Sequence, residues 1–226
     1  MKKAVVLLSG GVDSAVTLYV AKKNYDCSAL IFDYGQKASK EIECAKRIAE
    51  GAGTPYRVLT IALPWKGSAL LDESKSIPEG AASDNGRIPE TYVPGRNIIF
   101  LSFAVSFAEA DQSEAVFIGA HQLDFSNYPD CRGEFFESFR EVVRRGTRRG
   151  SEGLELKIET PLIDMRKKEI IETGHDLGVP FEHSWSCYRD NEIPCGVCES
   201  CLFRKHAFQE AGIKDPLLKY GTGVLQ

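Results

Sequence analysis

Several classes of protein are excluded by what this sequence lacks. No apolar run approaches the ~20 residues of a membrane-spanning helix, and the apolar residues after Met1-Lys2-Lys3 are too few for a secretion signal. Basic residues are not in excess, since the formal net charge is -4 and the isoelectric point is near 5.7, whereas a general nucleic-acid surface is usually basic. We therefore expect a cytoplasmic protein that acts on small molecules, with neither a membrane nor nucleic acid as a partner.

Two common nucleotide-binding signatures are missing as well. The chain has no GxxxxGK[ST] loop and no GxGxxG spacing, so it is predicted to be neither a kinase-type phosphate binder nor a dinucleotide-binding fold. Internal repeats and low-complexity tracts are also absent from the sequence. A different glycine-containing loop stands near the N-terminus.

This loop is Ser9-Gly10-Gly11-Val12-Asp13-Ser14, between an apolar segment at 4–8 and a helix-like segment at 15–23. Adjacent glycines allow a sharp turn and a close approach to a ligand, and the start of a helix offers free N–H groups to a phosphate. Ser9 and Ser14 add hydroxyl donors, and Asp13 is a candidate Mg²⁺ ligand or helix cap. The alternative is an ordinary strand-to-helix turn. The six residues together, in this context, favour a phosphate site over that alternative.

Apolar runs and helical periodicity alternate along the chain. Strands are predicted at 3–8, 28–32, 56–63, 115–120 and 154–162, and helices at 15–23, 39–52, 98–110, 134–149, 167–177 and 202–211. This alternation predicts an α/β fold, a Rossmann-like three-layer sandwich with a mostly parallel central sheet. We assign residues 1–180 to a nucleotide-binding domain and 181–226 to a small C-terminal zinc-binding subdomain. The segment 64–95 lacks periodicity and is interpreted as a lid.

A nucleotide site is expected to extend along the carboxyl edge of the sheet, where open α/β folds bind ligands. The second predicted strand ends in Asp33-Tyr34-Gly35-Gln36, so we place adenine and ribose there, although Tyr34 in an ordinary loop is the alternative. Arg96 stands at the entrance to the helix predicted over 98–110, where its planar guanidinium is suited to clamp a phosphate. A surface ion pair is the alternative role for Arg96.

The loop after the fourth predicted strand, 121–132, gathers acids, amides, aromatic rings and an arginine. A carboxylate can accept hydrogen bonds from both the ring N–H and the exocyclic amine of a guanine-like base, and an aromatic ring can stack on that base. Cys131 is left out of the reaction, because a lone cysteine is usually buried and inert. The residues predicted to contact the substrate are Asp124, Phe125, Tyr128, Asp130 and Arg132.

Four of the seven cysteines are crowded near the C-terminus, at Cys187, Cys195, Cys198 and Cys201. Their C-x7-C-x2-C-x2-C spacing is typical of a tetrahedral zinc site made of four thiolates. Iron–sulfur ligation is the alternative, although no further redox motif accompanies the cysteines. Because four thiolates leave no open ligand position, we predict one structural zinc ion per chain, in a reducing compartment.

The loop from Ser9 to Ser14 resembles that of the N-type ATP pyrophosphatase, or PP-loop, superfamily, whose members cleave ATP between the α- and β-phosphates and adenylate a substrate oxygen. Over nearly the whole chain, the sequence resembles the 7-cyano-7-deazaguanine synthase family of that superfamily. The further motifs are Asp33-Tyr34-Gly35-Gln36, Val93-Pro94-Gly95-Arg96-Asn97, Tyr128-Pro129-Asp130-Cys131-Arg132, Thr160-Pro161-Leu162 and the four cysteines. The resemblance implies catalytic roles for Ser9, Asp13, Ser14 and Arg96. The residues it implies for ATP binding are Leu8, Ser9, Gly10, Gly11, Val12, Asp13, Ser14, Ala15, Val16, Thr17, Leu18, Asp33, Tyr34 and Gln36.

The resemblance also implies a reaction, in which ATP, Mg²⁺ and ammonia convert 7-carboxy-7-deazaguanine to the nitrile for queuosine or archaeosine, commonly in a homodimer. Since oxide is a poor leaving group, AMP is transferred first to the carboxylate and later to the amide oxygen. No glutaminase region is left over in the sequence, so free ammonia or a partner is expected to supply nitrogen. Two alternatives stay open: another PP-loop adenylating enzyme, such as a tRNA-modifying one, and a zinc-ribbon binding module.

Overall fold

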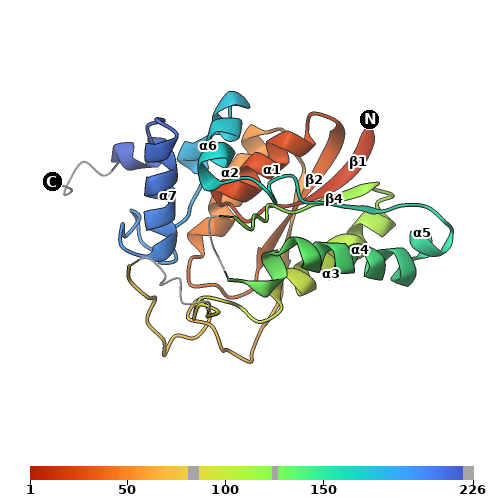
Figure 1. Ribbon diagram of the computed structural model, residues 1–226, viewed down its shortest axis with the longest axis horizontal. Coiled ribbons are helices and arrows are strands. Elements are labelled where there is room, and N and C mark those ends of the chain that lie inside the picture. The colour runs from red at the N-terminus through yellow and green to blue at the C-terminus, as the bar shows by residue number, and fades with distance from the viewer. Residues whose placement is uncertain (81–86, 124–126, 221–226) are drawn as a thin grey trace.

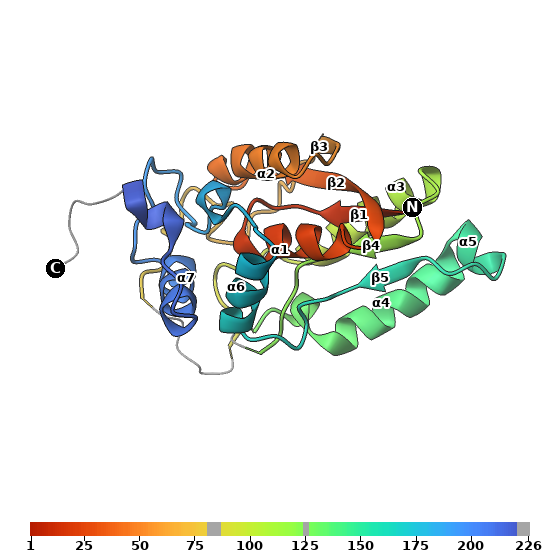
Figure 2. The ribbon, with the colours of Figure 1, turned by 90° about the horizontal axis from the view of Figure 1, so that it is seen from above.

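A parallel sheet forms the centre of the computed structural model, which describes residues 1–80, 87–123 and 127–220. The strands among these residues are β1 (Lys2–Leu7), β2 (Tyr25–Asp33), β3 (Tyr56–Thr60), β4 (Ala115–Phe117) and β5 (Lys157–Glu159). Their order across the sheet is β3-β2-β1-β4-β5, and every neighbouring pair is parallel. The predicted parallel sheet is therefore confirmed, with β1 in the middle (Figure 1, Figure 2).

The middle strand is apolar on both sides because both of its faces are covered. Successive side chains of a strand point to opposite faces, and here Val5 and Leu7 belong to one core while Ala4 and Val6 belong to the other. All four are buried. A continuous apolar run, rather than an alternating one, is what a doubly covered parallel strand requires.

Helices form the outer two layers. The helices α1 (Val12–Ala21), α2 (Lys40–Gly51) and α6 (Lys167–Asp176) cover one face, and α3 (Arg96–Ala110) and α4 (Gly133–Gly146) cover the other (Figure 1). This arrangement confirms the predicted three-layer sandwich. In the described ranges, no helix combines the length and the apolar character needed to cross a membrane.

The helix α7 (Glu199–Glu210) lies beyond the carboxyl ends of the strands (Figure 2). The segment before it returns to the sheet, where the Trp185 N–H donates to the Gly10 carbonyl over 2.8 Å. Phe181 and Phe208 pack in the same core as α1 and α6. The C-terminal segment is thus joined to the sheet by a shared core, and the boundary after residue 180 stays a prediction.

Several predicted elements are longer than the observed ones, among them the strand predicted over 115–120, which covers only Ala115–Phe117. The strand predicted over 56–63 ends at Thr60, and the one predicted over 154–162 covers only Lys157–Glu159. The helix predicted over 134–149 ends at Gly146, because Thr147 adopts an extended conformation and its hydroxyl accepts from the Gly150 N–H at the start of the short helix α5 (Arg148–Ser151).

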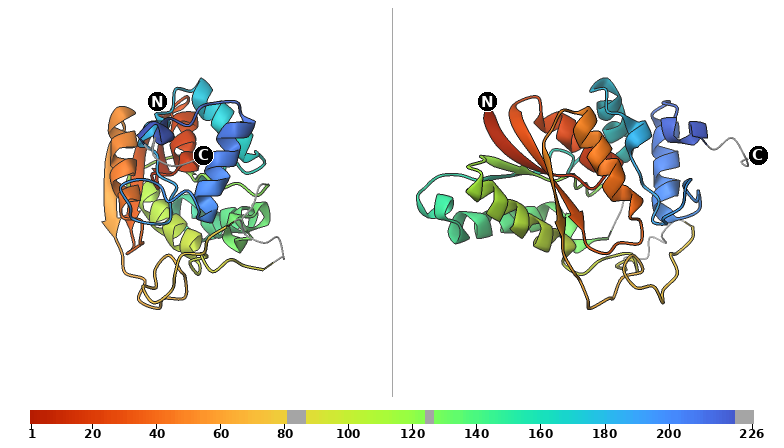
Figure 3. Two further views of the ribbon diagram at one scale, coloured as in Figure 1. Left: turned by 90° about the vertical axis from the view of Figure 1, so that its left-hand side faces the viewer. Right: turned by 180° about the vertical axis from the view of Figure 1, so that it is seen from behind.

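The segment 64–95 has neither helix nor strand in its described parts, 64–80 and 87–95. It follows a long path along the molecule (Figure 3), yet Ala69, Ile77 and Val93 are buried in the core beneath α3. The Gly80 N–H also donates to the Val197 carbonyl over 2.9 Å. These contacts anchor the segment, and its interpretation as a lid stays a prediction.

Candidate functional site

A cavity of about 260 Å³ opens at the carboxyl ends of β1 and β2. Its wall is formed by the loop after β1, the end of β2, the start of α3 and the segment that leads into α7. Parallel α/β sheets bind ligands at this edge, because the strand-to-helix turns and helix N-termini meet there. The phosphate loop predicted from the sequence therefore lines part of this cavity.

The two serines fasten the phosphate loop. The Ser14 hydroxyl accepts from the Ser9 N–H over 3.1 Å and donates to the Gly11 carbonyl over 3.0 Å. Gly10 has a φ of +85°, and a Cβ there would lie 2.2 Å from the Glu41 carbonyl oxygen. Only glycine fits this position, since a side chain would force α2 away from the loop.

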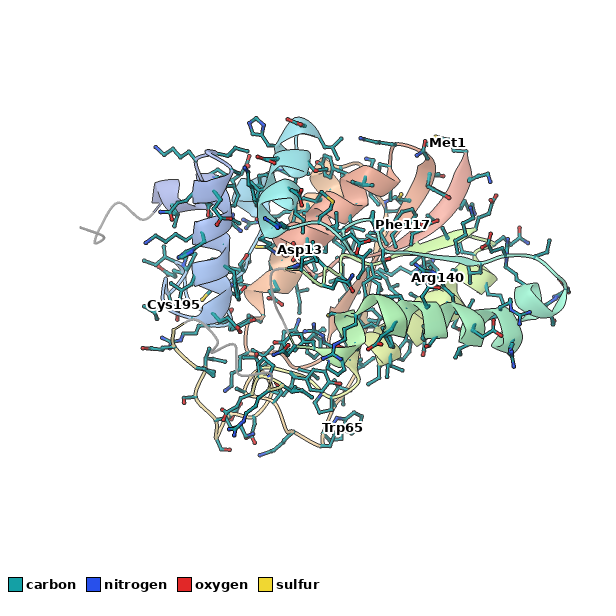
Figure 4. The ribbon with its side chains drawn as sticks, viewed as in Figure 1. Met1, Asp13, Trp65, Phe117, Arg140 and Cys195 are labelled. Atoms are coloured by element: carbon teal, nitrogen blue, oxygen red, sulfur yellow. The ribbon has the colours of Figure 1, made fainter. Side chains whose placement is uncertain are left out.

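Asp13 is the charged centre of the site (Figure 4). Lys167 Nζ lies 2.5 Å from its Oδ1 and 2.6 Å from its Oδ2, and His121 Nε2 lies 3.9 Å from Oδ2. Burial opposes ionisation of Asp13, but the attraction of Lys167 and His121 outweighs it, and the pKa of Asp13 lies below its ordinary value. The loop thus holds an ionised carboxylate, which can bind a cation. The lysine beside it can bind a phosphate.

The end of β2 makes the side of the cavity where adenine was predicted. Gln36 closes the turn, because its Oε1 accepts from the Tyr34 N–H over 2.9 Å and its Nε2 donates to the Phe32 carbonyl over 3.2 Å. The Arg96 guanidinium donates to the Tyr34 hydroxyl over 3.3 Å, and Phe100 stacks on Phe32 with ring centroids 4.1 Å apart. Apolar rings, a phenol and a guanidinium therefore line this side.

A second, smaller cavity of about 140 Å³ adjoins the first. The two cavities share Asp13, Lys167, Ser186, Tyr188 and Ser200 in their walls. They consequently meet at the carboxylate–lysine pair. Two ligands that occupy them would face each other there.

Most of the residues predicted to bind ATP line the larger cavity, and the others support it from behind. Those that line it are Leu8, Ser9, Gly11, Val12, Asp13, Ser14, Tyr34 and Gln36. Gly10 and Asp33 belong to the turns beside it but not to its wall, and Ala15, Val16, Thr17 and Leu18 are buried within α1. Arg96, predicted to be catalytic, lines the same cavity.

The predicted substrate residues are separated. Tyr128 lines the smaller cavity. Asp130 lines neither cavity; it is buried, which raises its pKa, and its Oδ2 accepts from the Asn97 N–H over 3.0 Å at the start of α3. Arg132 is exposed and lies 3.6 Å from Glu134. Asp124 and Phe125 lie outside the described residues.

The four C-terminal cysteines come together as a metal site requires. The sulfur atoms of Cys187, Cys195, Cys198 and Cys201 all lie within 4.8 Å of one another, and a tetrahedral site with metal–sulfur bonds of about 2.3 Å needs sulfurs roughly 3.8 Å apart. The pKa of Cys198 lies below its ordinary value, because the Cys187 and Cys201 thiols hydrogen-bond to its sulfur. Figure 4 labels Cys195, which lies beside α7 and away from Asp13.

Sequence reasoning missed Lys167, Glu41 and Trp185, which all line the larger cavity. Tyr34 was predicted from the rule that ligands bind at the carboxyl ends of parallel strands. The same rule applies to Lys167, which begins the helix after β5. Glu41 and Trp185 carried no comparable signal, because their place depends on how α2 and the C-terminal segment pack against the loop.

Comparisons with known proteins show which sequences and structures the chain is similar to. A family model described as queuosine biosynthesis protein QueC matches residues 3–212. The 7-cyano-7-deazaguanine synthases of Nostoc punctiforme and Clostridium kluyveri are each 48% identical over 221 residues, which is 96% of this chain and 99% and 97% of theirs. Among solved structures, the NMN synthetase of Francisella tularensis aligns with 94% of this chain and 78% of its own, at 17% identity and a TM-score of 0.49.

Proposed function

Because the chain belongs to the QueC family of queuosine biosynthesis proteins, we propose that it converts 7-carboxy-7-deazaguanine and ammonia to 7-cyano-7-deazaguanine, with cleavage of ATP to AMP and pyrophosphate. The observation that carries the mechanism is the pair of cavities that meet at Asp13 and Lys167. The larger one is lined by the phosphate loop and suits ATP. The smaller one suits the acceptor.

The reaction uses ATP twice. A carboxylate oxygen of the substrate attacks the α-phosphorus, pyrophosphate leaves, and AMP becomes joined to the carboxylate. Ammonia attacks the carboxyl carbon, and AMP leaves with that oxygen to give the amide. After the amide oxygen is adenylated in the same way, loss of AMP and of the two N–H protons gives the nitrile.

The residues of the loop act by electrostatics rather than as nucleophiles. The N–H groups at the start of α1 and the Lys167 ammonium would stabilise the charge on the departing pyrophosphate. The hydroxyls of Ser9 and Ser14 would hold the loop in the shape that this requires. The buried indole N–H of Trp185 has no hydrogen-bond partner among the described residues, and it lines the same cavity. A phosphate oxygen would give this donor the acceptor that it lacks.

The cofactors follow from the donor atoms. Asp13 would hold Mg²⁺, since it is ionised and faces the phosphate site, and the ion would supply positive charge to the phosphates. The four cysteines would hold one structural Zn²⁺. We further propose a homodimer in the cytoplasm, where a reducing compartment keeps the four thiols available to a metal.

The test is to incubate the purified chain with Mg-ATP, ammonium and 7-carboxy-7-deazaguanine and to follow the products by mass spectrometry. We expect AMP and pyrophosphate together with the amide and then the nitrile, two AMP being formed for each nitrile. Formation of AMP without deazaguanine products would support ATP cleavage at this site and contradict the proposal that 7-carboxy-7-deazaguanine is the substrate. No cleavage of ATP would contradict the proposal altogether.

A further inference from the structure

The smaller cavity contains a buried carboxyl group that the reaction scheme does not use. Glu199 is the first residue of α7 and is only 8% exposed. Its side chain lines the cavity, and its Oε1 is buried without a hydrogen-bond partner among the described residues. A buried acceptor that has lost water and found no donor is costly, so it points to a ligand that brings the donor.

We propose that the smaller cavity holds the deazaguanine base and that Glu199 selects it by accepting the ring N–H and the exocyclic amine. This inference rests on the proposed function and names the recognition site within it. The edge of a guanine-like base presents two neighbouring donors, and a carboxylate presents two neighbouring acceptors. The match is specific, because an adenine-like base carries a ring acceptor where guanine carries the N–H.

The walls of the cavity suit a flat bicyclic ring. Tyr128, Tyr188 and Phe203 contribute aromatic side chains, on which a base can stack. Tyr128 is held in place by a 2.7 Å hydrogen bond between its hydroxyl and that of Thr91. A hollow of about 140 Å³ is comparable in size to one base.

The cavity also orients the base toward the reaction. Asp13 and Lys167 form the part of its wall that is shared with the ATP cavity. In 7-carboxy-7-deazaguanine the carboxylate is on the five-membered ring, away from the edge that carries the ring N–H and the amine. With that edge at Glu199, the carboxylate would extend toward Lys167 and the α-phosphate.

Other carboxylates are already engaged or lie elsewhere. Asp13 is paired with Lys167, and Asp130 accepts from the backbone of Asn97 outside the cavity wall. Among the described residues that line the smaller cavity, Asp13 and Glu199 are the only acids. Glu199 is therefore the acceptor left for the base.

The decisive experiment compares Glu199→Gln with wild type on two substrates, 7-carboxy-7-deazaguanine and its analogue without the 2-amino group. Glutamine keeps the size of the side chain but replaces one acceptor by a donor, so we expect KM for 7-carboxy-7-deazaguanine to rise about tenfold to a hundredfold. KM for ATP should change less than twofold. The wild-type preference for the 2-amino substrate should disappear, which a merely structural role of Glu199 would not cause.

Glu210→Gln is the matched control, since Glu210 is exposed at the other end of α7. It should behave as wild type. A Glu199→Gln protein with unchanged KM and unchanged substrate preference would overturn the proposal while leaving the proposed function intact. If the wild-type protein does not convert 7-carboxy-7-deazaguanine, the proposed function itself is wrong.

Metal content is measured in each variant, because Glu199 follows Cys198 directly. If Glu199→Gln binds less zinc than wild type, Phe203→Ala decides in its place. We expect this variant to keep its zinc and ATP affinity and to bind the substrate at least about tenfold more weakly, as loss of a stacking ring predicts. Unchanged substrate affinity would overturn the proposal.

Discussion

Glu41 shows how one side chain can report on the state of the site. Glu41 lines the larger cavity, and burial raises the pKa of its carboxyl group to about 8, although the nearby Arg96 acts in the opposite direction. Glu41 in turn acts on Tyr34, whose pKa is raised first of all by burial. Glu41 therefore holds its proton near neutral pH in the ligand-free protein.

This shift predicts a pH-dependent stability. Between the ordinary pKa of 4.5 and about 8, the unfolded chain releases the Glu41 proton while the folded chain keeps it, so the free energy of unfolding falls as the pH rises through this window. In Glu41→Gln that contribution is absent. We expect the Tm of Glu41→Gln, measured without nucleotide, to rise relative to the Tm of wild type as the pH increases from 6 to 8.5.

Glu43→Gln is the control, because Glu43 is exposed on the same helix. Its Tm difference from wild type should be the same at both pH values. A Glu41→Gln protein that follows the wild-type pH profile would show that Glu41 is ionised in the folded protein at neutral pH.

Among the elements, α7 is fixed by a buried ion pair. The Arg204 guanidinium donates from Nε to one Asp215 oxygen over 2.7 Å and from a terminal nitrogen to the other over 2.9 Å. The same group donates to the Ser184 hydroxyl over 2.8 Å and to the Phe181 carbonyl over 3.1 Å. One side chain thus ties the helix to the chain before the cysteines and to the chain after it.

Arg204→Met should be strongly destabilising. It leaves Asp215 buried without its partner, a change that costs about 3–5 kcal/mol, and urea unfolding measures it. Adding Asp215→Asn should restore part of the loss, because no uncompensated charge then remains. Arg148→Met, which removes an exposed pair with Glu152, should cost less than about 1 kcal/mol; an equal effect of the two arginines would contradict the structural role given to Arg204.

The elements also show what the sequence could predict. The strands at the centre of the sheet are continuous apolar runs, which carry their own signal. Their ends depend on the partner strand: β3 stops where β2 does, with Thr60 opposite Asp33, and β5 pairs with β4 over only three residues, Ala115 to Phe117. When the end of a strand is set by a partner strand that is distant in the sequence, the residues around that end carry no pattern that would predict it.

The same distinction holds for the site. The loop from Ser9 to Ser14 is contiguous and the four cysteines are closely spaced, so that their coming together could be predicted from the spacing. Lys167 reaches Asp13 across 154 positions of the chain, and Glu199 meets Tyr128 only because α7 packs at the end of the sheet. Such pairs are products of the tertiary fold, and periodicity cannot indicate them.

At the scale of the whole molecule, one short segment joins the four-cysteine cluster to the larger cavity. The larger cavity is lined by Trp185, Ser186, Tyr188 and Ser200, which flank the four cysteines or lie between them. The hydrogen bond from the backbone N–H of Trp185 to the Gly10 carbonyl connects this segment to the phosphate loop. A metal held there would shape the wall of the site without touching a reacting atom.

Removal of zinc should therefore abolish activity before it unfolds the sheet. Metal analysis of the untreated protein should find about one zinc per chain, and iron in its place would contradict the assignment. After treatment with a chelator we expect weaker ATP binding, lost nitrile formation and largely retained circular dichroism, with recovery on addition of Zn²⁺. Cys195→Ser should reproduce the loss, whereas Cys44→Ala, outside the cluster, should keep both zinc and activity.

The middle position of β1 sets an order of events on the ribosome. Among the described strands of the sheet β1 is translated before the others, and β2 soon covers one of its edges, but its other partner, β4, begins only at Ala115. At about 5–20 residues per second, roughly 100 residues take some ~5–20 s to polymerise. Throughout that interval an apolar strand edge stays open in the growing chain. Nascent β1 is thus the place where a chaperone would be needed, and the larger cavity is complete only after the segment from Trp185 to Ser200 has left the exit tunnel.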